Sequence, residues 1–288
     1  MSRVLLEIDN TLPRKELFTF LKENKKALIA QKKAVKKDFY SAVPSFTYGV
    51  KEPGKEIVEM KAVGEAVIPD TATSIMVEAA ANTSMWCDSS MDVLLKNAGK
   101  KSIKERKGMI PHIYDHEWSI LSEVGDVKSI YYQDVPLRTL MVNMDGTAQV
   151  LTFYTEVIKS YNPAVFEKYR LKRIKQHSIG LMYDDIQLAI NEPDDEYWQD
   201  EYKVWKKYFD QIINKEVPEE RGYFFAVSQF TLLENSAVML GANFLTPTLS
   251  TTEKTVDTED TPPIEGTDRG PSENDFDVQI AIRTAKFF

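Results

Sequence analysis

Cysteine and histidine are scarce in this chain of 288 residues, which has one cysteine, Cys87, and three histidines. A single cysteine excludes an internal disulfide framework and a zinc site built from cysteines. It is compatible with a reducing compartment, and an inert buried thiol is a more ordinary role for Cys87 than a nucleophile. Any chemistry that needs an imidazole must therefore use His112, His116 or His177.

The chain also lacks an apolar run that is long and uninterrupted enough to predict a membrane-spanning helix. Its most apolar stretch, residues 222–245, contains Glu234, which is costly to place in lipid. The Phe, Val, Thr and Leu residues of this stretch predict two β-strands. The N-terminal sequence MSRVLLEIDN turns polar too early for a signal peptide. The sequence therefore predicts no membrane partner.

A general excess of positive charge is absent as well, because the formal net charge is −8. Nearly all of that excess lies between Thr251 and Asp277, where nine acidic residues accompany two basic ones. The rest of the chain is close to neutral, which predicts no nucleic-acid-binding face. Seven lysines between Lys22 and Lys37 form the main basic cluster.

The predicted organisation has three parts. Residues 1–54 hold a short apolar run, Val4–Ile8, and then leucines at helical spacing, which predict an N-terminal strand and a basic amphipathic helix. The lysines of this helix form either a solvated face or an arm that docks on an acidic partner. Residues 249–288 are acidic and rich in Thr and Pro, which is typical of a disordered tail. The last residues, VQIAIRTAKFF, are apolar and suit a short strand or a docking peptide.

The middle part, residues 55–248, mixes strands and helices without strict alternation, which favours the α+β class. Strands are predicted at 56–69, 73–81, 126–135, 137–142 and 177–190, besides the two in 222–245. Helices are predicted within 87–108, over 147–160, from Asn162-Pro163 to about 172, and over 192–215.

Two histidines lie four residues apart in the segment PHIYDHEWS, and this spacing admits several interpretations. On a helix, His112 and His116 would share a face and bind zinc, as in the related motif H-x-x-E-H. Pro111 before them and a predicted strand soon after argue against such a helix. The other interpretations are the base of a nucleophilic hydrolase, or ordinary surface histidines on a polar loop.

Ser178 is the most conspicuous candidate nucleophile, because it begins an apolar strand and is followed by Gly180. Adjacent strand residues point to opposite faces, so His177 is a poor base for it and is more simply an exposed or packing residue. The base must then be His112 or His116. Glu234 lies inside an apolar strand, where a carboxylate needs a partner such as an imidazolium, unless it faces solvent from an edge strand.

Three segments in this order, YDHEWSI, HSIGLM and LLENSAVMLGANFLTP, resemble the prohead (capsid maturation) proteases of tailed phages. Those proteases are related in fold to the assemblin proteases of herpesviruses. The resemblance covers about residues 55–247. It implies a small β-barrel-like α+β core of about six or seven strands surrounded by helices. The 56 positions between Ser178 and Glu234 exceed the short connection of the family, so residues 192–215 are interpreted as a helical insertion.

The resemblance implies a serine endopeptidase in which Ser178 is the nucleophile, His116 the base and Glu234 the third member of the triad, with His112 as the alternative base. It implies no metal or cofactor. The implied substrates are the scaffold, the scaffold-like segment of the major capsid protein and the protease itself, inside assembling proheads in the host cytoplasm. A homo-oligomer is left open. The alternatives are a non-enzymatic capsid assembly protein on the same fold and a zinc-dependent hydrolase that uses His112 and His116.

Overall fold

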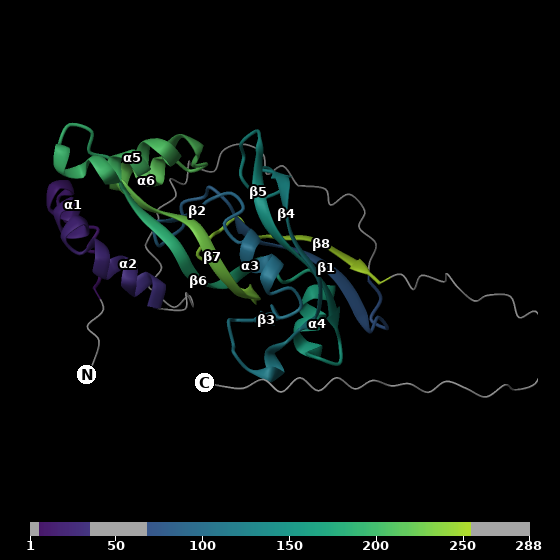
Figure 1. Ribbon diagram of the computed structural model, residues 1–288. Coiled ribbons are helices and arrows are strands. Elements are labelled where there is room, and N and C mark those ends of the chain that lie inside the picture. Colours follow the sequence, from purple (N-terminus) through teal and green to yellow (C-terminus); the bar gives the residue numbers. More distant parts are fainter. Residues whose placement is uncertain (1–5, 35–67, 255–288) are drawn as a thin grey trace, which may run out of the picture. The chain divides into compact units, whose positions relative to one another are not determined.

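The computed structural model describes residues 6–34 and 68–254, and Figure 1 shows a mixed β-sheet accompanied by helices. The helices are α1 (Arg14–Glu23), α2 (Lys25–Ala34), α3 (Lys100–Glu105), α4 (Pro163–Arg170), α5 (Gln199–Tyr208) and α6 (Glu216–Arg221). The strands are β1 (Ser74–Thr83), β2 (Asp92–Leu94), β3 (His112–Tyr114), β4 (Gly125–Pro136), β5 (Thr147–Ile158), β6 (Gln176–Ile190), β7 (Tyr223–Val238) and β8 (Thr248–Glu253).

The eight strands form one open sheet in the order β2-β7-β3-β4-β5-β1-β8, with β6 along the other side of β7. All pairs are antiparallel except that β2 and β3 both run parallel to β7. An isolated bridge joins Gln176, at the start of β6, to Pro247, just before β8. The α+β class is thus confirmed. The expected barrel-like core of six or seven strands is not, since the sheet has eight strands and is not closed.

Strand β5 corrects the prediction of a helix over 147–160. Val150, Leu151, Phe153 and Val157 are all fully buried, because β5 lies between β4 and β1 in the sheet and is covered on both faces. Apolar residues on both faces imitate the spacing of a helix. The Val, Thr, Phe and Tyr content of this segment is the better signal, since such residues favour a pleated, half-buried surface.

Strand β7 corrects a second prediction, because residues 223–238 form one continuous strand of 16 residues rather than two. It pairs with β6 over almost its whole length, and three register shifts in the ladder let the long pair bend. Residues 137–142, predicted as a short strand, form a turn. The predicted helix over 192–215 is divided into α5 and short 3-10 turns, and that within 87–108 is reduced to α3.

Several predicted elements are confirmed. Strands β1, β4 and β6 fall on the predicted segments, and α4 begins at the predicted cap. There the Asn162 side chain accepts a hydrogen bond from the backbone N–H of Val165, and Pro163 occupies the first turn. The predicted strand over 56–69 lies mostly outside the described residues, as do the domain boundary at 54/55, the tail beyond 254 and the segment VQIAIRTAKFF. Residues 249–253 of the expected tail belong to β8.

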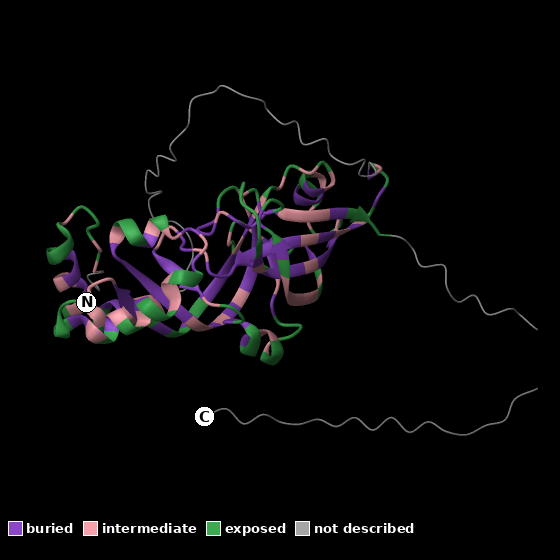
Figure 2. Cartoon of the chain, turned by 90° about the horizontal axis from the view of Figure 1, so that it is seen from above, coloured by how far each residue is buried: buried purple, intermediate pink, exposed green. Residues whose placement is uncertain are grey.

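The N-terminal helices pack on the same compact unit as the sheet. Leu17, Phe18, Leu21 and Leu28 are buried in its largest hydrophobic cluster. Figure 2 shows the buried residues gathered along the sheet and the exposed ones on outer helix faces and loops. No strand is present at residues 6–8, although the apolar run Val4–Ile8 predicted one.

Three lysines of these helices contact buried carboxylates of the same chain rather than only solvent. Lys22 and Lys25 bind Glu201 of α5 at 2.6 and 2.5 Å, and Lys32 binds Asp92 of β2 at 2.6 Å. Burial acts to raise the pKa of Glu201, but the hydrogen bonds from the two lysines outweigh it and hold the pKa below its ordinary value. These ion pairs join α1 and α2 to α5, and α2 to β2.

Candidate active site

The ladder between β6 and β7 gathers the predicted serine and glutamate on one face. Ser178 pairs with Ser236, and Gly180 pairs with Glu234. Residues directly opposite in a ladder point to the same face, as do residues two apart in one strand. Ser178, Gly180, Glu234 and Ser236 therefore share one face, which we call the outer face of the β6–β7 pair.

Glu234 is completely buried on this face, and Gly180 makes room for it. A Cβ atom added to Gly180 would lie 2.3 Å from Oε1 of Glu234 and 3.0 Å from its Cδ. No side chain fits at that distance, so glycine at position 180 lets the carboxylate lie across the strand. The sequence segment S-I-G thus has a steric reason for its glycine.

His116 reaches the same face from a tight turn after β3. The parallel pairing of β3 with β7 places Tyr114 beside Ala237, and the chain then passes through two consecutive left-handed residues, Asp115 (φ 48°) and His116 (φ 54°). Such conformations are strained for residues with a side chain. The turn is held by hydrogen bonds from the Asp115 N–H to the Ala237 carbonyl (2.9 Å) and from the His116 N–H to Ser236 Oγ (3.0 Å).

The imidazole of His116 contacts the carboxylate of Glu234. Its Nδ1 lies 2.6 Å from Oε1, and the His116 side chain is only 8% exposed. Because an ionised carboxylate only accepts, the proton of a neutral ring must be on Nδ1. Nε2 then carries a lone pair, and it has no hydrogen-bond partner among the described residues although it is buried. An imidazole in this state is ready to accept a proton.

Ser178 is half-buried on the outer face, two ladder positions from Glu234, but the described residues contain no hydrogen bond between it and His116. The loop after β7 passes close by, since a Cβ added to Gly241 would lie 3.5 Å from Cβ of Ser178. The structure thus joins two of the three predicted residues and brings the third to their face without a direct bond.

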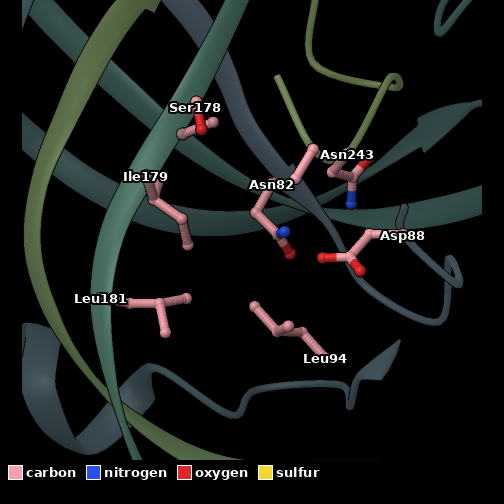
Figure 3. Close-up of a pocket in the computed structure, with 9 residues that line it drawn as sticks. Asn82, Asp88, Leu94, Ser178, Ile179, Leu181 and Asn243 are labelled. Atoms are coloured by element: carbon pink, nitrogen blue, oxygen red, sulfur yellow. The ribbon is translucent and has the colours of Figure 1, made fainter. Parts of the chain in front are cut away.

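A small pocket of about 20 Å³ lies beside Ser178. Figure 3 shows Ser178, Ile179 and Leu181 along β6 on one side, with Asn82, Asp88 and Asn243 across from them. A space of this size holds about one water-sized group. It therefore offers a small recess next to the serine, lined by both polar and apolar residues, which does not take a whole side chain without movement.

The other two histidines lie on the opposite, inner face of the sheet, His177 on β6 and His112 on β3, which pairs with β7. Of the two roles expected for His177, the structure shows the packing role. His112 and His177 are both completely buried, so neither is a surface residue. Tyr169 of α4 lies between them, with its hydroxyl 3.0 Å from Nε2 of His112 and 2.9 Å from Nε2 of His177. Nδ1 of His112 contacts Thr155 Oγ1 at 2.9 Å. Both ring nitrogens of His112 thus have partners within the protein, which argues against its alternative roles as a base or a zinc ligand.

The hydrogen bonds of this inner cluster form a chain, and the group at one end of the chain fixes the direction of every bond. The Thr246 carbonyl only accepts, so Nδ1 of His177, 3.4 Å away, donates to it. Nε2 of His177 then accepts from the Tyr169 hydroxyl, whose oxygen accepts from Nε2 of His112. Nδ1 of His112 accepts in turn from Thr155. Every donor and acceptor of the two neutral rings is used once.

Burial keeps the inner cluster neutral. It lowers the pKa of His177 to about 4, although the hydrogen bond to the Thr246 carbonyl acts to raise it. Burial, with charge repulsion from His177, lowers the pKa of His112 well below its ordinary value, and burial raises that of the Tyr169 hydroxyl. The rings of His112 and His177 are thus neutral and fully hydrogen-bonded, whereas the amide of Asn235, buried next to them on β7, has no hydrogen-bond partner among the described residues.

Sequence reasoning missed Ser236, Gly180 and Tyr169 as parts of these sites. The first two were detectable, because residues at alternate positions of a strand share a face with Ser178 or Glu234. Tyr169 carried no such signal, since only tertiary packing brings α4 to the strands. Cys87 is buried, and its backbone pairs with the Asn214 amide at 2.8 and 2.9 Å, consistent with an inert thiol.

Within residues 6–34 and 68–254, no cluster of three or more His, Cys, Asp or Glu side chains is arranged to hold a metal ion. In the same ranges, none of the helices combines the length and the apolar character that crossing a membrane requires. Comparisons of this chain with protein-family models, with curated proteins and with solved structures find no match.

Proposed function

We propose that this protein is a serine endopeptidase of phage prohead maturation. The observation that carries the proposal is the contact between Nδ1 of His116 and Glu234, which leaves Nε2 buried and unpaired on the face that also carries Ser178. A buried polar atom without a partner is costly, and a catalytic role is one of the reasons for which a folded protein keeps such an atom. The resemblance of the three sequence segments to prohead proteases supplies the reaction class and, by analogy, an assemblin-like fold.

In the proposed mechanism, Nε2 of His116 removes the proton of the Ser178 hydroxyl as its oxygen attacks a substrate carbonyl. The Glu234 carboxylate stabilises the resulting imidazolium and keeps the proton of the neutral ring on Nδ1. The imidazolium then gives its proton to the leaving amine, and an acyl-enzyme on Ser178 remains. Water, deprotonated by His116, hydrolyses that ester. The missing Ser178–His116 bond fits a free enzyme, because catalytic hydrogen bonds often tighten only when substrate binds.

The proposed substrates are the scaffold, the scaffold-like segment of the major capsid protein and the protease itself, within proheads in the host cytoplasm. No cofactor is required by this mechanism. The second candidate is a non-enzymatic assembly protein on the same fold. The observation in its favour is that Ser178 and His116 are not hydrogen-bonded in the described structure.

The test is co-expression with the major capsid protein of the same phage, comparing wild type with Ser178→Ala. The control is Ser228→Ala, which removes a serine hydroxyl that bonds Asp185 elsewhere on the β6–β7 pair. We expect capsid processing in wild type and control, and none in Ser178→Ala. Processing that persists in Ser178→Ala excludes the serine mechanism. Correct assembly by all three proteins without any cleavage favours the assembly protein.

A further inference from the structure

The outer face carries two serines, and their surroundings differ. Ser178 and Ser236 form one ladder pair, so both side chains lie on the face that carries the His116–Glu234 contact. Ser236 is completely buried, whereas Ser178 is half-buried. Ser236 Oγ lies 2.8 Å from Oε2 of Glu234 and 3.0 Å from the backbone nitrogen of His116. A hydroxyl so enclosed is a poor nucleophile, which leaves the question of what it does.

The direction of the two bonds at Ser236 is fixed. A carboxylate only accepts, so the single hydroxyl proton of Ser236 is donated to Glu234. The backbone N–H of His116 only donates, so the Ser236 oxygen accepts from it. One side chain therefore holds the carboxylate of Glu234 and the main chain of His116 at the same time.

Each of these two groups needs such support. His116 and Asp115 both have positive φ, and a strained turn persists only when its surroundings fix it. Glu234 uses Oε1 for the imidazole, so the bond from Ser236 to Oε2 determines how the carboxylate is rotated. Gly180 closes the other side of the carboxylate. Ser236 thus bears on both the position of the ring and the position of its partner.

We propose that Ser236 is a positioning residue that locks the His116–Glu234 pair in its reactive geometry and takes no part in bond making. Its relevance to catalysis rests on the proposed function. Its structural part, the effect on the hydrogen bond between Nδ1 of His116 and Glu234, does not. The two parts therefore have separate measurements.

The structural part is tested by the imidazole proton of His116 in NMR spectra. A proton held on Nδ1 against a carboxylate at 2.6 Å gives a downfield signal that exchanges slowly with water. We expect this signal in wild type, in Ser178→Ala and in the control Ser228→Ala. We expect it to be lost or broadened in Ser236→Ala and retained in Ser236→Thr, which keeps the hydroxyl. An unchanged signal in Ser236→Ala overturns the proposal.

The catalytic part is tested by the rate at which a fluorophosphonate labels the protein, with the labelled residue identified by peptide mapping. We expect Ser178 to be labelled and the rate to fall about 10- to 100-fold in Ser236→Ala, since small displacements of a catalytic group have effects of that order. In a Glu234→Gln background the same change should have little further effect, because both residues act through one unit. Labelling of Ser236 itself, or equal effects in both backgrounds, overturns the proposal.

The two measurements separate this proposal from the proposed function. One outcome is that wild-type protein is not labelled at all, while the NMR signal is lost in Ser236→Ala. This outcome supports the positioning role of Ser236 and contradicts the proposed protease activity. If Ser236→Ala gives no folded protein by circular dichroism, Ser236→Cys replaces it in both assays, because a thiol keeps the side chain in place but donates weakly. If Ser236→Cys keeps the NMR signal and the labelling rate of wild type, the positioning role of Ser236 is contradicted.

Discussion

The two faces of the β6–β7 pair use the same residue type in opposite ways. On the inner face, His112 and His177 are fully buried, and all four ring nitrogens have partners. On the outer face, His116 is nearly as buried, but only one ring nitrogen has a partner among the described residues. Adjacent residues of β6 point to the two faces, His177 to the inner face and Ser178 to the outer face.

The difference lies in the hydrogen-bond partners of each ring. Burial without charge makes the inner histidines weak bases, and complete hydrogen bonding makes them part of the core. The outer histidine is buried beside the carboxylate of Glu234, and its Nε2 has no partner among the described residues. Histidine count and spacing do not reveal this difference, but the partner of each nitrogen does.

The largest expected effect separates the two faces by activity. We expect His116→Gln to lower the rate of fluorophosphonate labelling by about 10⁴-fold or more, because members of a triad act as one unit. We expect His112→Gln to change that rate by less than about tenfold in folded protein, because His112 faces away from Ser178. The rates are measured on protein that passes a circular dichroism check. Equal losses in both variants would contradict the division between the faces.

The second prediction concerns the pH dependence of folding stability that arises from the inner histidines. The pKa of His177 is about 4 in the folded protein and about 6.5 in an unfolded chain. Since the unfolded state binds the proton more readily, folding stability is highest above pH 6.5 and falls as the pH is lowered toward 4. Each inner histidine should remove about 1.4 kcal/mol of unfolding free energy per pH unit in that window.

This pH dependence is measured by urea unfolding between pH 6.5 and 5, with His177→Gln as the comparison. The variant should lose less stability over the window, by about 2 kcal/mol, because one of the two linked protons is absent. Parallel curves for wild type and variant would show that His177 is not held neutral by the fold.

The third prediction concerns the residue that joins the inner cluster. Tyr169→Phe removes one hydroxyl and leaves Nε2 of both His112 and His177 buried without a partner. We expect the unfolding free energy to fall by about 2–6 kcal/mol, from about 1–3 kcal/mol for each of the two unsatisfied groups. The labelling rate of Ser178 should change by less than about tenfold. Urea unfolding and labelling of the same samples check both, and a large loss of activity with unchanged stability would contradict the structural role.

Much of the fold follows from local patterns, and the errors have a common cause. The Asn162-Pro163 cap and the strand that begins near His177 were predictable, because caps and alternating strands are local signals. Residues 147–160 were predicted as a helix because β5 is covered on both faces and has no simple alternation. The continuity of β7 was missed because polar residues inside it suggested a break. Its partner strand, far away in sequence, satisfies that backbone instead.

The candidate site was also predictable only in part. His116, Glu234 and Ser178 were selected from residue types and a family resemblance, and the contact between the first two is present in the structure. The choice between His112 and His116 was open in the sequence, because both lie in one short segment. In the structure, His112 lies within β3 and points inward, whereas His116 lies beyond its end in a left-handed turn and contacts Glu234.

Local sequence patterns were enough to predict the α+β class, α4 and several strands, and they named the residue types available for chemistry. The tertiary structure adds that His116 contacts Glu234, that Gly180 leaves room for this carboxylate, and that Ser236 bonds both Glu234 and His116. The physical reason is that hydrogen-bond partners and cross-strand neighbours are set by the ladder between β6 and β7. In that ladder Ser178 and Ser236 lie side by side although 58 positions separate them in the chain.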